Sequence, residues 1–226
     1  SRIWPRTAAI AERFWSPAYV SEVDDMYRRL KTTSRWLEWV GVTHLSGYPV
    51  MLARLSAGRP IEPLRTLTDL LEPLKGYRRG RTRAYSRFTP LNRLVDAVRP
   101  ESIQARGFGV LVDEYLESDS NRADDLSLRI EKQLVNWRDN HQSILSVAAS
   151  STMLPEAEAL SAQLRITAET GLTALRDLDS GTPTGDSDYA ARLSILANAD
   201  TTRGALQLVV VEHVRRLVEA AHTRHW

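Results

Sequence analysis

Apolar side chains recur at intervals of three and four residues along most of this 226-residue chain. Leu126, Ile130 and Leu134 form one such row, and Leu160 and Leu164 begin another. This spacing places apolar side chains on one face of an α-helix, whereas a half-buried strand alternates apolar and polar residues. No series of strands accompanies these rows, which argues against a complete β/α barrel, a doubly wound sheet or a sandwich within the chain. The predicted fold class is therefore all-α.

Several segments carry the helical pattern clearly. They span residues 3–15, 21–41, 48–57, 103–115, 126–148, 155–178, 188–198 and 202–222. From residue 101 onward they predict an antiparallel helical bundle. Within the last segment, the β-branched run from Val209 to Val211 leaves a strand open as an alternative, although its flanks keep the helical period.

Residues 59–100 differ from their flanks because prolines interrupt them repeatedly. Short helices are expected at residues 66–74 and 91–98, since the periodic stretches there are brief. The remainder is expected to be an extended connector that wraps another surface.

The amino-acid composition excludes several kinds of site and partner. The chain has no Cys, which excludes disulfides, thiolate catalysis and Cys-ligated zinc. Its 30 Lys and Arg residues and 28 Asp and Glu residues leave a formal net charge of +2, too balanced to indicate a polyanion partner. No apolar run approaches the ~18 residues needed to span a bilayer, so no membrane partner is expected. The chain begins with Ser1 and not Met, and we expect it to be a piece of a longer protein.

The sequence predicts no catalytic residue, no metal site and no cofactor. His222 and His225 lie three residues apart, but further metal ligands are unspecified, and a frayed C-terminal turn is the favoured interpretation. Neither a glycine-rich phosphate loop nor a Gly-x-Ser-x-Gly elbow occurs. Adjacent carboxylates such as Asp24 and Asp25 diverge on a helix, and they suit its dipole better than acid–base catalysis.

The most conspicuous charged feature runs from Lys75 to Arg87. Its candidate interaction patch consists of Arg78, Arg79, Arg81 and Arg83, with aromatic residues interleaved. Such a segment can hold single-stranded nucleic acid through phosphate contacts and base stacking. The alternative is that these arginines pair with acidic residues and carbonyls of a neighbouring region. The balanced charge elsewhere favours that alternative, so nucleic acid is not the expected partner.

The segment Trp4-Pro-Arg-Thr-Ala-Ala-Ile-Ala-Glu-Arg-Phe-Trp-Ser-Pro17 resembles the last barrel helix of glycoside hydrolase family 20, the β-N-acetylhexosaminidases. In that family a Trp-Pro-Arg opening, an Ala-rich middle and an Ala-Glu-Arg-aromatic-Trp-Ser ending recur. Residues 24–30 and 41–44 also resemble the family's post-barrel helix. Residues 90–97 resemble part of an extra C-terminal region found in bacterial hexosaminidase-like proteins. Glu12 and Arg13 belong to the helix motif and are interpreted as structural.

This resemblance implies three parts. Residues 1–58 would be the last barrel helix and post-barrel helices of a missing catalytic domain, residues 59–100 a basic connector, and residues 101–226 a C-terminal helical bundle. The family's Asp–Glu pair, which orients the substrate acetamide and protonates the leaving group, lies upstream of the last helix and has no counterpart here. The implied role is a non-catalytic structural or assembly domain whose partner is the upstream barrel of the same polypeptide. A periplasmic or secreted parent would follow from the family.

Two alternatives remain open. A carbohydrate-binding module would use Trp36 and Trp39, which can share a helix face for stacking on a glycan containing N-acetylglucosamine, although packing against the missing barrel would explain them equally. A nucleic-acid or protein interaction domain would use residues 75–88. On the first interpretation, apolar surface is expected to be exposed around Ile3, Trp4, Ile10 and Phe14. Such a surface predicts self-association, with a homodimer as the simplest form.

Overall fold

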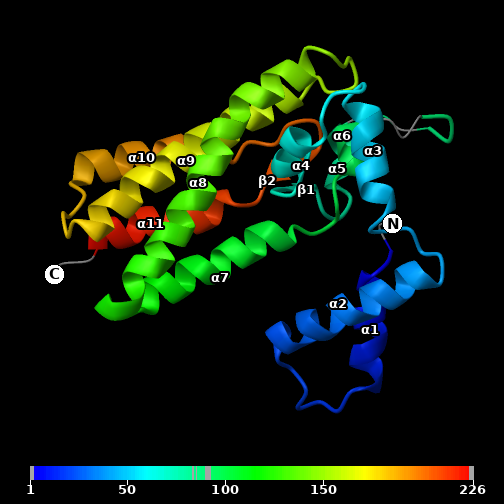
Figure 1. The fold of residues 1–226 in the computed structure, drawn as a ribbon, viewed down its shortest axis with the longest axis horizontal. Helices are drawn as coiled ribbons and strands as arrows, with labels where there is room; N and C mark the ends of the chain where they lie inside the picture. Colours follow the sequence, from blue (N-terminus) through cyan, green and yellow to red (C-terminus); the bar gives the residue numbers. More distant parts are fainter. Residues whose placement is uncertain (1–2, 83, 85, 90–92, 224–226) are drawn as a thin grey trace.

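A computed structural model describes residues 3–82, 84, 86–89 and 93–223 (Figure 1). The fold is predominantly all-α, as the apolar spacing predicts, with one two-stranded sheet among the described residues. The helices are α1 (Arg6–Trp15), α2 (Val23–Trp39), α3 (Gly47–Leu55), α4 (Glu62–Thr68), α5 (Arg78–Thr82), α6 (Leu94–Ala97), α7 (Ile103–Glu117), α8 (Ser120–Ala148), α9 (Ala157–Asp179), α10 (Asp186–Ala199) and α11 (Val211–Thr223). The strands are β1 (Leu71–Pro73) and β2 (Leu206–Leu208).

Helices α1 and α2, which are consecutive in the sequence, project together from the rest of the molecule (Figure 1). We call these two helices the arm and the described part of residues 47–223 the body. Within the arm, Arg29 of α2 pairs with both Glu12 of α1 and Asp25 of its own helix. Arg13 donates from Nη1 to the Val20 carbonyl at 3.1 Å. Glu12 thus joins α1 to α2, and Arg13 joins α1 to the loop between the two helices, which agrees with a structural role.

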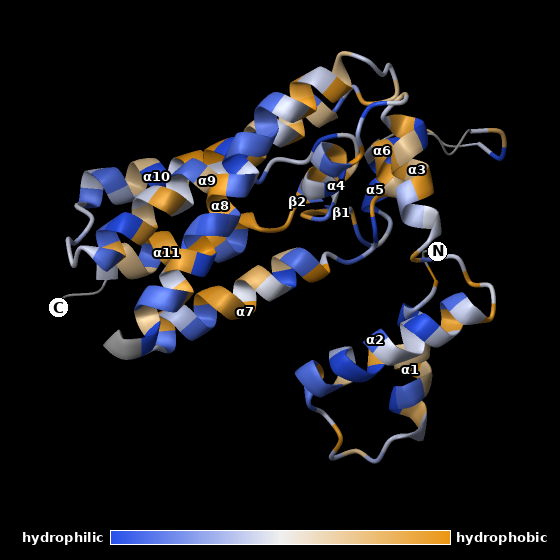
Figure 2. Cartoon of the chain, viewed as in Figure 1, coloured by the Kyte–Doolittle hydropathy of each residue, from blue (hydrophilic) through white to orange (hydrophobic). Residues whose placement is uncertain are grey.

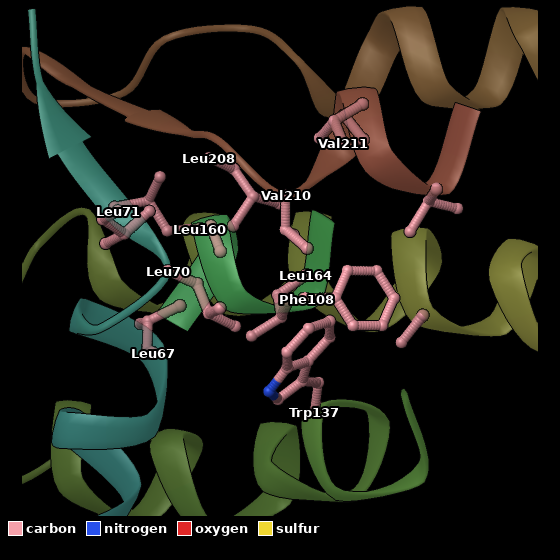
Figure 3. Packing of buried hydrophobic residues seen from close by; sticks show 14 of the residues in the cluster. Leu67, Leu70, Leu71, Phe108, Trp137, Leu160, Leu164, Leu208, Val210 and Val211 are labelled. Carbon is pink, nitrogen blue, oxygen red and sulfur yellow. The ribbon is translucent and has the colours of Figure 1, made fainter. Parts of the chain in front are cut away.

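Helices α7 to α11 enclose the main apolar core of the body. Helix α8 packs along α9, which also contacts α10 and α11. Phe108 of α7 meets Trp137 of α8 edge to face, with ring centroids 4.7 Å apart (Figure 3). Trp137 is buried, as its place in an apolar row predicts. Each fully buried leucine or aromatic side chain contributes about 1.5–3 kcal/mol of apolar burial, so these rows hold the bundle together.

Helix α4, strand β1 and helix α6 belong to the same core, which corrects the expectation of an extended connector for these parts, whereas the described residues between 75 and 89 are mostly exposed. Leu64, Leu67, Leu71 and Leu94 are fully buried, and α4 packs against α8 (Figure 3 includes Leu67 and Leu71). Proline interrupts a helix interior but is tolerated in the first turn. Pro63 occupies that first turn in α4 and so accompanies a helix start. The cluster of buried residues continues from Tyr48 to Ala221 across the boundaries proposed at 58 and 100.

The expectation of one helix over residues 202–222 was wrong at its beginning. Gly204 and Ala205 have positive φ angles of 55° and 66°, which no right-handed helix accommodates. The next residues form β2, which pairs antiparallel with β1 in the register Leu71 to Leu208. That pairing also replaces the second half of the helix expected at residues 66–74. Helix α11 begins only at Val211.

Candidate functional site

Trp36 and Trp39 lie on one side of α2, as their spacing predicts. Their ring centroids are 5.8 Å apart, their planes are perpendicular, and they are 62% and 79% exposed. The pair is therefore open to a partner. Because the rings are perpendicular, they do not form one flat platform.

The candidate basic patch is divided by the structure. Arg78 and Arg81 are exposed on α5, whereas Arg79 donates to Asp96 of α6 at 2.5 Å. Arg83 lies outside the described residues. Arg79 thus follows the alternative interpretation, in which an arginine pairs with an acidic residue of a neighbouring region.

His222 is ordered within α11, so the expectation of a frayed turn was wrong at this residue. Its Nδ1 lies 2.9 Å from the Thr184 carbonyl oxygen, and its ring stacks on Tyr189 at a centroid distance of 4.1 Å. His225 lies outside the described residues. Among the described residues, no group of three or more His, Cys, Asp or Glu side chains is placed to hold a metal ion. In that same part of the chain, no helix has both the length and the apolar character needed to cross a membrane.

A polar cluster that sequence reasoning missed lies where α2 ends. His44 Nε2 is 2.5 Å from Ser34 Oγ, and His44 Nδ1 is 2.9 Å from the Val42 carbonyl oxygen and 3.5 Å from Glu38 Oε1. That Glu38 oxygen also accepts from the backbone N–H of Leu45 at 2.6 Å. A serine next to a histidine that is in turn next to a carboxylate is also the arrangement of hydrolytic triads. Here Ser34 and His44 are buried and Glu38 is bound to backbone, so the cluster secures the turn between α2 and α3.

The apolar surface of the arm is left largely uncovered by the other described residues. Helix α1 buries none of its residues, and α2 buries only Ser34. Ile10, Phe14 and Trp15 of α1 are 56%, 83% and 90% exposed. Figure 2 shows these two helices standing apart from the body, with apolar and polar residues side by side. Ile3 is exposed as expected, whereas Trp4 is half-buried.

A second feature lies where the arm meets the body. A cleft of about 550 Å³ opens between α2, α7 and α11, and we call it the junction cleft. Arg106 of α7 pairs with Asp24 and lies 4.3 Å over the ring of Tyr27, both in α2. Burial and the nearby Glu101 carboxylate raise the pKa of Tyr27, so its hydroxyl stays protonated at neutral pH. His213 and Arg216 of α11 line the opposite wall.

Comparison with known proteins gives one informative result. No protein-family model and no curated protein matches the chain. The structure is similar to the X-ray structure of Flavobacterium johnsoniae chitobiase, designated FjGH20, with a TM-score of 0.83 and 27% sequence identity. The match covers 96% of this chain and 32% of the chitobiase chain, so this chain spans about a third of that protein's length. The likeness extends the resemblance to glycoside hydrolase family 20 from the N-terminal motif to nearly the whole chain.

Proposed function

We propose that this chain is a non-catalytic helical part of a larger hexosaminidase-like glycoside hydrolase, and that it docks on the rest of that polypeptide through the apolar surface of the arm. The observation that carries the proposal is α1, a ten-residue helix with exposed aromatic side chains and no buried residue. A helix with an apolar face is stable where that face is covered. The described residues supply no such cover, so its natural partner lies outside them.

The energetics support a large partner surface. Phe14 and Trp15 are almost entirely exposed, and burial of each would contribute about 1.5–3 kcal/mol. Exposed apolar patches of more than a few hundred Å² are rare on monomeric proteins and mark interaction sites. The remaining two-thirds of the chitobiase chain has no counterpart in this chain, and such a region would supply the partner.

The proposal assigns catalysis to the absent region. The Asp–Glu pair that the family resemblance implies for catalysis would lie upstream of α1 and has no counterpart in this chain. The Ser34, His44 and Glu38 cluster is committed to a backbone turn. The role proposed for this chain is therefore structural: it buttresses the catalytic region or takes part in its assembly.

Two measurements on the purified chain test the proposal. The chain should not hydrolyse an aryl N-acetylglucosaminide, and hydrolysis at an enzyme-like rate would refute the non-catalytic assignment. Light scattering across a concentration series should show self-association, which Phe14→Ser should weaken. Leu128→Ser on α8 is the matched control, because Leu128 is a large apolar residue that is likewise exposed, at 63%, but lies outside the arm. A monomer at every concentration, or equal effects of both variants, would contradict docking through the arm.

A second candidate function rests on the exposure of Trp36 and Trp39. As a carbohydrate-binding module, the chain would stack these rings on a glycan containing N-acetylglucosamine. Titration with short chitin oligomers, followed by tryptophan fluorescence and calorimetry, tests this candidate. Unchanged affinity in Trp36→Ala and Trp39→Ala would eliminate these residues as the glycan site.

A further inference from the structure

We propose that the junction cleft is a binding site for a small neutral ligand rich in hydroxyl or amide groups, of monosaccharide or disaccharide size. This site is separate from the apolar surface of the arm, and it does not depend on the docking role proposed above. Its volume of about 550 Å³ lies within the range of about 300–1,000 Å³ that is typical of small-molecule sites.

One wall of the cleft is built around a missing side chain. Gly109 lies within α7, where glycine costs roughly 0.5–1 kcal/mol relative to alanine. A Cβ atom at residue 109 would lie 2.6 Å from His213 Cε1 and 2.8 Å from its Nδ1. The imidazole ring of α11 therefore occupies the space that any other residue would fill. Gly107, two residues earlier, has nothing within 4 Å of such an atom.

The His213 ring is also oriented by hydrogen bonds. Arg216 Nη2 donates to His213 Nδ1 at 2.8 Å and to the Gly109 carbonyl oxygen at 3.2 Å. Arg216 Nη1 donates to Asp113 of α7, which fixes the guanidinium group. Because arginine has no acceptor, His213 Nδ1 must accept, and in the neutral ring the proton is on Nε2. His213, which lines the cleft, therefore has an oriented ring and carries its N–H on Nε2.

Among the described residues, every charged side chain that lines the cleft except Glu101 has a partner of opposite charge. Lys75 lies 2.9 Å from Glu72, Arg216 bonds Asp113, and Arg106 bonds Asp24 across the junction. An anionic ligand would have to compete with these carboxylates for their cations, and a cationic ligand would find only Glu101 without a partner of opposite charge. The cleft therefore favours ligands without a net charge.

Neutral hydroxyl and amide groups suit such a lining. A hydroxyl both donates and accepts, so it can bond a paired carboxylate and a paired guanidinium without breaking the pair. The donors among the lining residues are His213 and the guanidinium group of Arg106, and the acceptors include the carboxylates of Glu101 and Glu212. Several such groups on one compact skeleton describe a saccharide-like polyol.

A series of four sugars with one skeleton tests the charge preference. Glucose and N-acetylglucosamine are neutral, glucosamine is cationic at pH 6.5, and glucuronate is anionic. Each is titrated into the full chain labelled with ¹⁵N, and the amide signals of α7 and α11 and the ring signals of His213 report occupancy. We expect saturable shifts with at least one neutral sugar and weaker binding of both charged sugars.

Matched glycine variants test the site. Gly109→Ala should displace the His213 ring and lower the affinity for the neutral sugar by about tenfold or more. This is the loss expected for one oriented hydrogen bond. Gly107→Ala should leave the affinity within about twofold of the wild type. If Gly109→Ala does not fold, His213→Ala provides the same test without crowding α7, and circular dichroism checks each variant.

Three outcomes would overturn the proposal. The first is no saturation by any of the four sugars up to about 50 mM, a range that covers weak sites. The second is tighter binding of glucosamine or glucuronate than of the neutral sugars. The third is binding that survives Gly109→Ala and His213→Ala but is lost in Trp36→Ala, which would place it on the arm. None of these outcomes bears on self-association through Phe14, so the docking role is tested separately.

Discussion

Asp179 is the last residue of α9, and its carboxylate joins the ends of three helices. Oδ1 accepts from the hydroxyl of Tyr115 in α7 at 2.7 Å, and Oδ2 accepts from the hydroxyl of Ser127 in α8 at 2.6 Å. A carboxylate at a helix C-terminus opposes the helix dipole, at a cost of about 0.3–1 kcal/mol. We therefore expect Asp179 to stabilise the fold through these two bonds and in spite of its position.

The size of the effect follows from this balance. A hydrogen bond to a charged group contributes about 1.5–3 kcal/mol, and the low end applies because Asp179 is exposed. Asp179→Ala removes both bonds and also relieves the unfavourable interaction with the helix dipole. The free energy of unfolding should therefore fall by about 2 kcal/mol. Asp179→Asn keeps one carbonyl acceptor and should lose about half as much.

Urea denaturation followed by circular dichroism measures these differences. The matched control is Asp125→Ala on α8, whose exposed partner Arg129 lies 3.8 Å away, and which should cost less than about 0.5 kcal/mol. The double variant with Tyr115→Phe should lose less than the sum of the single losses, because both remove the same bond. A loss for Asp179→Ala no larger than that of Asp125→Ala would refute the reasoning.

Three further outcomes are expected. Burial and the Arg216 guanidinium lower the pKa of His213 below its ordinary value of 6.5, so as the pH falls the unfolded chain takes up this proton first. Stability should decline as the pH falls below about 6.5, and His213→Gln should reduce that slope in urea titrations at several pH values; equal slopes would contradict the shift. Gly171→Val should lose about 2 kcal/mol or more in thermal melts, because even a Cβ there would lie 3.1 Å from Leu134 Cδ1. Gly107→Ala should gain up to about 1 kcal/mol in the same melts, since that space is open, and a loss would mean that the space is not free.

Long apolar rows made the main helices predictable. The row through Leu126, Ile130 and Leu134 is long enough to define a period. The side chains of these three residues of α8 are fully buried. Strand β2 was not predictable, because three residues have no measurable period. Its stability depends on pairing with Leu71–Pro73, far away in the sequence.

The candidate sites also differ in how far they can be predicted from the sequence. That Trp36 and Trp39 lie on one side of α2 follows from their spacing, so sequence reasoning reaches this arrangement, whereas their exposure is seen only in the structure. The junction cleft depends on contacts between α7 and α11, and no local pattern encodes those contacts. Gly109 carried the available signal, because a glycine within a helix often marks a close approach by another group.

The pairing of β1 with β2 has a consequence for synthesis. The strands come from the first third and the last tenth of the chain, and α7 to α10 lie between them in the sequence. On the ribosome, Leu71 therefore emerges long before its partner Leu208, and the apolar side chains around it stay uncovered until Leu208 has been synthesised. The body should consequently acquire its native structure late and as a whole, and ribosome-bound intermediates that end before β2 should be the species most prone to aggregate.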